Sequence, residues 1–229
     1  MPRRLRMDLG NIVYHVLNRR VSRMAMFDKG EDYAAFEKAL DEAYRKVPMR
    51  VLAYCLMPNH WHLVLWPRYD GHLARYMQWL TTTHMRRWHA HHDTRGTGPL
   101  YQGRYKSFPV QEDQHFLTVC RYVERNALRA NLVKRSEDWP WSSMSRRGRK
   151  KRCEWLLPIK DWPVETPRSW TAFVNRPETG KELEALRRSV ARGAPYGDDA
   201  WQKRTAVRLK LESSLRNPWR PKKNKKANK

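Results

Sequence analysis

Short apolar runs mark three strands in the first part of the chain. Residues 11–17 are largely apolar and partly β-branched, a composition typical of a strand. Two more runs, 49–57 and 60–66, flank Pro58-Asn59, a dipeptide that favours turns, so together they predict a hairpin. Because both runs are apolar at successive positions, we expect the hairpin at the centre of a sheet that is covered on at least one face.

Longer segments with apolar side chains at helical spacing alternate with these strands. We predict helices over 31–47, 71–92 and 112–127, and a further strand over 104–110. The order strand, helix, strand, strand, helix, strand, followed by a helix, is typical of a ferredoxin-like split βαβ domain of the α+β class with a central antiparallel sheet. Other antiparallel α+β arrangements remain alternatives.

The composition changes beyond Trp141. Six of the seven residues in 146–152 are basic, which predicts a mobile loop, and the segments 181–192 and 199–215 predict two further helices. The end of the chain is basic and contains no acidic residue, which is typical of a disordered tail. We therefore divide the chain into a domain at 1–145, a basic linker with a C-terminal helical extension at 146–219, and a disordered basic tail at 220–229.

The composition indicates a globular, strongly basic protein. The 229 residues include 47 Lys and Arg against 23 Asp and Glu, a formal net charge of +24, and 40% are hydrophobic, which excludes wholesale disorder. No run approaches the roughly 18 apolar residues of a membrane span, and the N-terminus lacks the apolar run of a signal peptide. The scattered cysteines Cys55, Cys120 and Cys153 exclude a disulfide framework and a paired-cysteine zinc site, so we expect a reducing cytoplasm.

The positive charge favours nucleic acid as the partner. Each phosphate that Lys or Arg neutralises releases counterions, and Trp and Tyr side chains interleaved with Arg suit base stacking. Attachment to a membrane surface, or solubility alone, would explain the same charge. Charge by itself says nothing about catalysis.

Two histidines in the second hairpin strand are the first candidates for chemistry. Strand alternation sends His60 and His62 to one face and Trp61 to the other. Two imidazoles so placed can converge on one cation, although a hydrogen-bonded pair of interior histidines is the ordinary explanation. The strand is otherwise strongly apolar, and burying two polar rings without partners is costly. This moves the interpretation toward a metal site.

A tyrosine in the predicted helix 112–127 is the second candidate. At about 100° per residue, Tyr122 and Asn126 lie on the flank of the apolar stripe, and Arg129 shares that flank if the helix persists. A boundary tyrosine that caps the core is the ordinary explanation. A phenol is also able to act as a covalent nucleophile, and Asn126 would add an oxygen ligand to a nearby metal.

Several other enzyme signatures are absent from the sequence. It has no Gly-rich phosphate loop ending in Gly-Lys-Ser/Thr, no deaminase zinc motif and no His-Glu-x-x-His. A group of histidines near the end of the helix at 71–92 has a spacing that suits a transition metal, but a solvated polar helix end is the favoured interpretation. Its members are His84, His89, His91 and His92.

Four ordered blocks resemble a known family. Residues 57–66 (MPNHWHLVLW) resemble the HUH strand of single-tyrosine transposases, where U is a bulky hydrophobic residue. Residues 121–133 (RYVERNALRANLV) look like their nucleophile helix, and 100–107 (LYQGRYKS) resembles a block between the two. Residues 138–143 (DWPWSS) and the pattern over 184–223 look like REP-associated tyrosine transposases, a bacterial branch of the HUH family.

The resemblance implies a metal-dependent tyrosine endonuclease and strand transferase. His60 and His62, with Asn126 as third protein ligand, would hold Mg²⁺ or Mn²⁺, and the cation would polarise the scissile phosphate. Tyr122 would attack phosphorus and leave a 5′-phosphotyrosine and a free 3′-hydroxyl. Many relatives have a proline where this chain has Ala127, so the position at which the helix ends is not defined by the resemblance. The polar Asn126 that precedes it is present in this chain.

The resemblance also implies partners. The substrate would be single-stranded DNA beside a REP-like hairpin, positioned by Arg104, Lys106 and Arg129 unless these are solvated surface charges. We expect a cytoplasmic, nucleoid-associated protein without membrane contact, and a monomer with Tyr122 acting in cis, with a homodimer as the alternative. The helical extension would clamp the DNA or brace the first domain. A non-catalytic hairpin-binding protein and an RNA-binding protein are the competing hypotheses.

Overall fold

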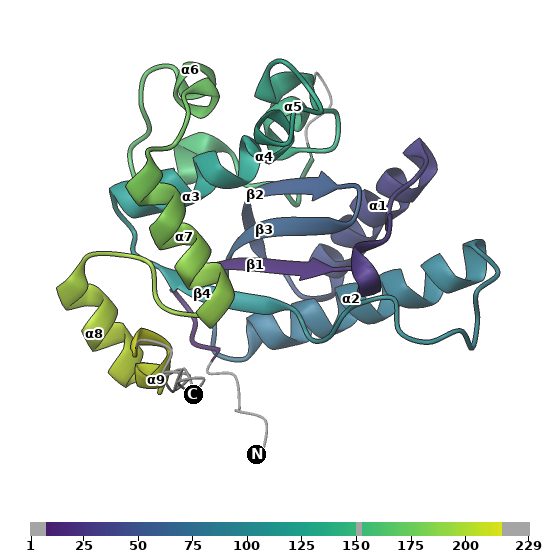
Figure 1. Cartoon of the computed structure of the whole chain (residues 1–229), viewed down its shortest axis with the longest axis horizontal. Coiled ribbons are helices and arrows are strands. Elements are labelled where there is room, and N and C mark those ends of the chain that lie inside the picture. Colours follow the sequence, from purple (N-terminus) through teal and green to yellow (C-terminus); the bar gives the residue numbers. More distant parts are fainter. Residues whose placement is uncertain (1–7, 150–152, 217–229) are drawn as a thin grey trace, which may run out of the picture.

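A four-stranded antiparallel sheet forms the centre of the computed structural model, which describes residues 8–149 and 153–216. The strand order β2-β3-β1-β4 is that of a ferredoxin-like domain, so the predicted α+β class and antiparallel sheet are confirmed. The strands, seen in Figure 1, are β1 (Val13–Arg19), β2 (Arg50–Met57), β3 (His60–Trp66) and β4 (Lys106–Val110).

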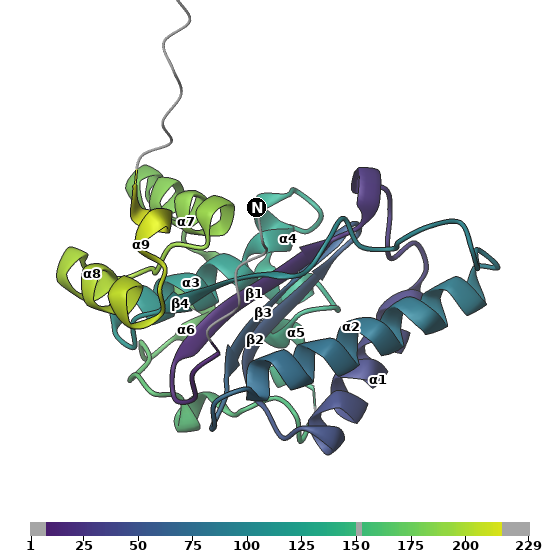
Figure 2. The ribbon, with the colours of Figure 1, turned by 90° about the horizontal axis from the view of Figure 1, so that it is seen from below.

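Helices cover both faces of this sheet. The long helices α1 (Gly30–Lys46) and α2 (His72–His91) pack against one face, while α3 (Gln114–Glu124) lies across the other (Figure 2). Successive strand residues contribute alternately to two hydrophobic clusters: Trp61 and Leu63 belong to the cluster under α1 and α2, whereas Val64 belongs to the cluster under α3. Two-sided burial explains why the strands are apolar at successive positions.

The hairpin does not lie wholly at the centre of the sheet. β3 and β1 are the central strands, and β2 is an edge strand by its pairing. Its outer side is nevertheless covered, because Leu56 N–H donates to Trp141 O at 2.9 Å and Leu157 N–H donates to Val51 O at 2.8 Å. These later segments satisfy the strand edge, so β2 is as buried as a central strand.

The predicted helix over 112–127 is broken at Arg125. α3 begins at an N-cap, Asp113, whose side chain accepts from His115 N–H, and it ends at Glu124. A separate short helix, α4 (Asn126–Arg129), follows, and Arg125 between them has φ −86° and ψ 0°. Tyr122 and Asn126 therefore stand on two helical segments rather than on one continuous face.

The region beyond residue 141 packs largely onto the face of the sheet that α3 covers, whereas Trp155, Leu156 and Leu209 belong to the cluster on the other face. Trp170, Leu186 and Tyr196 belong to the same hydrophobic cluster as the strand residue Val64, so packing continues across the expected boundary at 145. This region contains short α5 and α6, the longer α7 and α8, and a final turn. They are α5 (Ser143–Arg147), α6 (Trp170–Asn175), α7 (Gly180–Arg192), α8 (Asp199–Arg208) and α9 (Glu212–Leu215), with 3-10 turns at Val21–Arg23, Ser136–Asp138 and Ile159–Asp161.

Two sequence expectations for this region are revised. The basic segment 146–152 begins as the last turn of α5, and Arg146 pairs with the buried Glu37 at 2.8 Å, whereas 150–152 lies outside the described residues. The expected helix 199–215 is interrupted near Lys210, which has φ 53°. The expected tail at 220–229 also lies outside the described residues. Among the described residues, none of the helices combines the length and apolarity that crossing a membrane requires.

Candidate active site

The two histidines of β3 share one face of the sheet, as strand alternation predicts. The ring centroids of His60 and His62 are 5.0 Å apart with the planes nearly perpendicular. His62 is 3% exposed and His60 is half-buried, so the pair lies at the border of the core. Trp61 points to the opposite face and is fully buried, which assigns it to the fold.

A third histidine, His15 on β1, joins the pair. Its Nε2 lies 2.9 Å from Nδ1 of His62, and the two rings stack at 5.0 Å between centroids. His15 has no exposed surface, and in the described part of the chain its Nδ1 has no hydrogen-bond partner. Sequence reasoning missed His15, although an imidazole within the apolar run 11–17 was a signal of the same kind as His60 and His62.

Burial keeps the imidazoles neutral. Burial lowers the pKa of His60 to about 4, assisted by the nearby cations Arg19 and Arg129, and lowers the pKa of His15 to about 3. Burial also places the pKa of His62 well below its usual value. Neutral imidazoles keep a nitrogen lone pair free of a proton, which is the form that coordinates a metal.

The hydrogen bonds of the rings assign which nitrogen is available. Nδ1 of His60 lies 2.6 Å from Oδ1 of Asn59, so the imidazole N–H donates there and Nε2 carries the lone pair. Nδ1 of His62 is likewise occupied by His15. In metal-ligating histidines, the ring nitrogen that does not bind the metal usually forms a hydrogen bond. His60 and His62 have this arrangement, so their free nitrogens fit a divalent cation.

The predicted tyrosine lies beside the histidines. The ring of Tyr122 on α3 meets His62 edge-on at 5.9 Å and His15 at 6.3 Å between centroids. The guanidinium carbon of Arg129 stands 4.0 Å from the centre of the Tyr122 ring. The fold thus brings the phenol and the cation, which are seven residues apart, together with imidazoles from the distant strands β1 and β3.

The predicted third ligand, Asn126, is buried next to the same cation. Its Oδ1 accepts a hydrogen bond from Nη2 of Arg129 at 3.0 Å, and its Nδ2 has no partner among the described residues. Arg129 is therefore the residue that connects Asn126 to Tyr122, across the break at Arg125. The unpaired Nδ2 is a hydrogen-bond donor, so the atom of Asn126 that suits a cation is Oδ1, which here already accepts from Arg129.

Acidic side chains from the C-terminal region hold this cation in place. Glu178, with a side chain 1% exposed, accepts from Arg125 and Arg129 at 3.2 Å each. One turn earlier on α3, Arg121 pairs with Glu182 at 2.7 Å. The three arginines thus meet acids at the start of α7: Glu178 just before the helix and Glu182 in its first turn.

A second buried acid anchors α3 itself. Glu124, with no exposed surface, accepts a hydrogen bond from Trp170 Nε1 at 2.6 Å and from Ser143 Oγ at 2.5 Å, and it pairs with Arg147. Ser143 also accepts from Tyr54 N–H of β2 at 2.9 Å. Glu124 stands two residues after the tyrosine, so this network fixes the helix against the sheet, α5 and α6.

The two remaining predicted DNA contacts lie on the surface near β4. Arg104 and Lys106 are exposed and border a cavity of about 290 Å³ between β4, α7 and α9. Arg192 of α7 lines the opposite side of the cavity and binds the carbonyls of Ser213 and Ser214. Arg104, Lys106 and Arg192 form a basic rim. By strand register Lys106 pairs with Leu17, which pairs with His62 on its other side, so the rim begins two strands from the histidines of β3.

The chain is similar to a known protein family and to proteins of known description. The family described as "Transposase IS200 like" matches residues 8–126. A curated relative in Haemophilus influenzae, described as "Putative REP-associated tyrosine transposase", is 23% identical over 119 residues, covering 48% of this chain and 68% of the relative. A solved structure of a REP-associated tyrosine transposase bound to a REP hairpin is 18% identical, covers 69% of this chain and 90% of its own, and has a TM-score of 0.48.

Proposed function

Because the chain belongs to the IS200-like transposase family, we propose that it nicks and rejoins single-stranded DNA beside REP-type hairpins through a 5′-phosphotyrosine intermediate. The resemblance to REP-associated tyrosine transposases drawn from the sequence motifs is confirmed. The observation that carries the proposal is the position of Tyr122, edge-on to His62 and covered by the guanidinium of Arg129.

The proposed reaction exchanges one phosphoester bond for another. The Tyr122 oxygen attacks phosphorus and loses its proton, and the bond from phosphorus to the 3′-oxygen breaks, so that this oxygen leaves as a hydroxyl. The reverse attack by a 3′-hydroxyl rejoins DNA and releases the phenol. Since the phosphotyrosine link retains the energy of the broken bond, no nucleotide triphosphate is consumed. Arg129 would offset the negative charge that gathers at the phosphoryl oxygens.

A divalent cation at the histidine pair would assist this attack. His60 and His62 would hold it through nitrogen and Asn126 through its amide oxygen, and the bound ion polarises the scissile phosphate. Mg²⁺ and Mn²⁺ are the candidates, and nitrogen ligation favours Mn²⁺. The role of His15 is then to accept the Nδ1 proton of His62 and to fix the ring orientation.

Positive side chains would hold the DNA on either side of the phenol. Arg19 pairs with His60 across β1 and β3, so Arg19 and Arg129 both stand near the imidazoles. Arg104 and Lys106 on the basic rim would contact phosphates farther along the strand. The net charge of +24 and the exposure of both rim residues support this part of the proposal.

The arrangement supports catalysis by one chain. Tyr122 lies beside the histidines of its own sheet, so a second subunit need not supply the nucleophile. We therefore propose a monomer with the tyrosine acting in cis. Size-exclusion chromatography with light scattering, on free and hairpin-bound protein, measures this directly; a dimer that alone forms the covalent product would contradict it.

Covalent trapping tests the proposed function. Protein is incubated with a labelled single-stranded hairpin oligonucleotide and Mn²⁺, and the adduct is resolved by denaturing electrophoresis. Tyr122→Phe should bind the hairpin but form no adduct. Tyr76→Phe is the matched control, because Tyr76 belongs to α2, is buried in the cluster on the face opposite α3, and its hydroxyl has no partner among the described residues.

The outcomes separate the competing functions. An adduct that persists in Tyr122→Phe would assign the nucleophile elsewhere. Hairpin binding without an adduct in the wild-type protein would leave a non-catalytic binding protein. An RNA hairpin that competes as well as the DNA hairpin would favour an RNA-binding function, since the 2′-hydroxyl is the group that distinguishes the two.

A further inference from the structure

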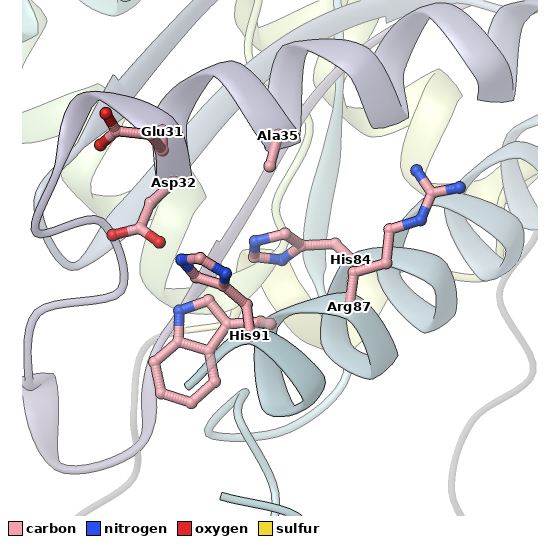
Figure 3. A pocket seen from close by; sticks show the side chains of 7 residues that line it. Glu31, Asp32, Ala35, His84, Arg87 and His91 are labelled. Carbon is pink, nitrogen blue, oxygen red and sulfur yellow. The ribbon is translucent and has the colours of Figure 1, made fainter. Parts of the chain in front are cut away.

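The histidines at the end of α2 form a cluster with an acid of α1. The sequence favours a solvated polar end for this helix, but His84 is buried, whereas His91 and His92 meet Asp32. Each of these three residues offers one ligand atom, and the atoms all lie within 4.8 Å of one another. Figure 3 shows the carboxylate of Asp32 and the imidazole of His91 turned toward one another.

Two of the three ligands are already oriented by the fold. Oδ2 of Asp32 accepts the backbone N–H groups of Asp28 and Lys29 at 2.9 and 3.0 Å, which directs Oδ1 toward His92. Nε2 of His92 lies 2.9 Å from that Oδ1, and its ring stacks on Trp88 at 4.2 Å. Asp32 is 5% exposed, so the carboxylate is a buried and fixed acceptor.

The third ligand is free to close around an ion. His91 is exposed, and its only ring contact among the described residues is with His92. Zinc ligands stand about 2.0–2.2 Å from the metal, so two ligands of one ion are at most about 4.3 Å apart. Since His91 is exposed, its side chain is the one that would move to bring the group within that limit.

We propose that Asp32, His91 and His92 form a transition-metal site, with Zn²⁺ as the ion that fits the donor set. Two imidazole nitrogens and one carboxylate oxygen are a three-ligand zinc set that leaves a fourth position for water. Asp32 and His91 also line a cavity of about 270 Å³, together with Glu31, Ala35 and Arg87 (Figure 3). A nitrogen-rich set favours Zn²⁺ over Mg²⁺, which prefers oxygen ligands.

This site is distinct from the proposed active site. Asp32, His91 and His92 belong to α1 and the end of α2, on the face opposite α3, whereas His60 and His62 share their face with Tyr122 (Figure 2). An ion at this site would link Asp32 in the first turn of α1 to His91 and His92 at the end of α2. The segment entering α1 is bonded to the hairpin turn, because Phe27 N–H donates to Pro58 O at 2.9 Å. The site would therefore stabilise the end of the fold that carries Asn59 and His60.

Metal binding by the purified full-length chain tests this inference without any activity assay. Metal-free protein is titrated with Zn²⁺ while unfolding temperature is measured, and with Co²⁺ while its d–d absorption is recorded. Wild-type protein should show the Co²⁺ spectrum of a nitrogen- and oxygen-ligated site and a higher unfolding temperature with Zn²⁺. His91→Ala should weaken the affinity at least tenfold, and Asp32→Asn, which keeps an oxygen acceptor for the α1 N-cap, should do the same.

Two controls locate the signal. His115→Ala removes a partly exposed histidine that pairs with Asp113 at 2.8 Å but belongs to no group of three ligands in the part of the chain that the structure describes, and it should leave binding unchanged. His60→Ala removes the proposed active-site ligand and should leave the Zn²⁺-dependent rise in unfolding temperature and the cluster's Co²⁺ spectrum intact. Binding that survives both His91→Ala and Asp32→Asn, or that disappears in His60→Ala alone, would overturn the inference.

Discussion

Nε2 of His15 lies 2.9 Å from Nδ1 of His62, so one proton is shared between two imidazoles that come from neighbouring strands. Both residues are buried, and burial holds the pKa of each below its usual value. A single hydrogen bond between neutral rings therefore occupies Nδ1 of His62 and leaves Nε2 as its other ring nitrogen.

Replacing His15 should weaken catalysis through the metal. We expect His15→Leu, which removes the acceptor for His62, to raise the Mn²⁺ concentration needed for half-maximal adduct formation by about 10–100-fold. His15→Gln offers an amide oxygen to the same proton and should retain most of the Mn²⁺ response. Circular dichroism and unfolding temperature check the fold of both variants. If His15→Leu and His15→Gln required the same Mn²⁺ concentration, the hydrogen bond to His62 would not matter for metal binding, and the role of His15 would be packing.

Glu178 should contribute more to stability than Glu182. Glu178 is buried and neutralises two arginines, whereas the side chain of Glu182 is 30% exposed and neutralises Arg121. Removing one partner of a buried ion pair leaves an uncompensated charge, so Glu178→Gln should lower the free energy of unfolding by about 3 kcal/mol.

Glu182→Gln is the matched variant. Solvent reaches the Glu182 carboxylate although the Arg121 side chain is 8% exposed, so the loss should be smaller than for Glu178→Gln, and glutamine also serves at the third position of the α7 capping box. Urea unfolding followed by tryptophan fluorescence gives both values. A loss for Glu182→Gln as large as that for Glu178→Gln would contradict the electrostatic account.

His84 should make the protein less stable in acid. Burial lowers its pKa to about 3, with Asp32 and His92 nearby, and Nδ1 accepts a hydrogen bond from the Tyr101 hydroxyl at 2.6 Å. The unfolded chain binds a proton there below about pH 6.5 while the folded chain does not, so stability is complete above that pH and falls as the pH drops toward 3. At pH 5 this group costs about 2 kcal/mol of stability.

The variant His84→Asn isolates that contribution. An amide oxygen can still accept from Tyr101 but does not titrate, so the loss of stability between pH 7 and pH 5 should be smaller by about 2 kcal/mol than in the wild-type protein. Urea titrations at the two pH values measure the difference. An identical loss in both proteins would show that His84 is protonated in the folded state.

DNA affinity should fall steeply with salt, and the basic rim should contribute to the slope. If about six to ten phosphates are neutralised, affinity should drop by about 10³–10⁵ between about 50 and 200 mM salt. Changing Arg104 and Lys106 together to Gln should reduce the slope of log K against log salt by about two. Lys38→Gln is the control, because Lys38 is exposed on α1, across the sheet from α3. An unchanged slope in the double variant would remove these residues from the DNA contact.

Periodicity in the sequence located the strands and the long helices but not every contact between them. The positions of His60, His62 and Trp61 follow from strand alternation alone, which the structure confirms. The contact between His15 and His62 depends on the pairing of β1 with β3. Residue spacing within one strand does not predict which strand lies next to it. The sequence therefore predicted the position of His62 but not its contact with His15.

Contacts between distant segments account for the remaining differences. Helical spacing placed Tyr122 and Asn126 on one flank, but the break at Arg125 separates them, and Arg129 restores the link. The acid that holds Arg129 lies 49 residues along the chain, at Glu178, where no local pattern identifies it. Short helices such as α5 and α6 have too few turns to show a period.

The family match ends at residue 126, yet the counter-charges for Arg121, Arg125 and Arg129 come from Glu178 and Glu182. A fragment that ends near residue 145 would lack both acids. Its three arginines would then have no carboxylate partners from α7, and one of them, Arg129, contacts the Tyr122 ring. A chimaera that moves the sheet and Tyr122 into another protein, or exchanges them with a homologue, should therefore include the segment that carries Glu178 and Glu182.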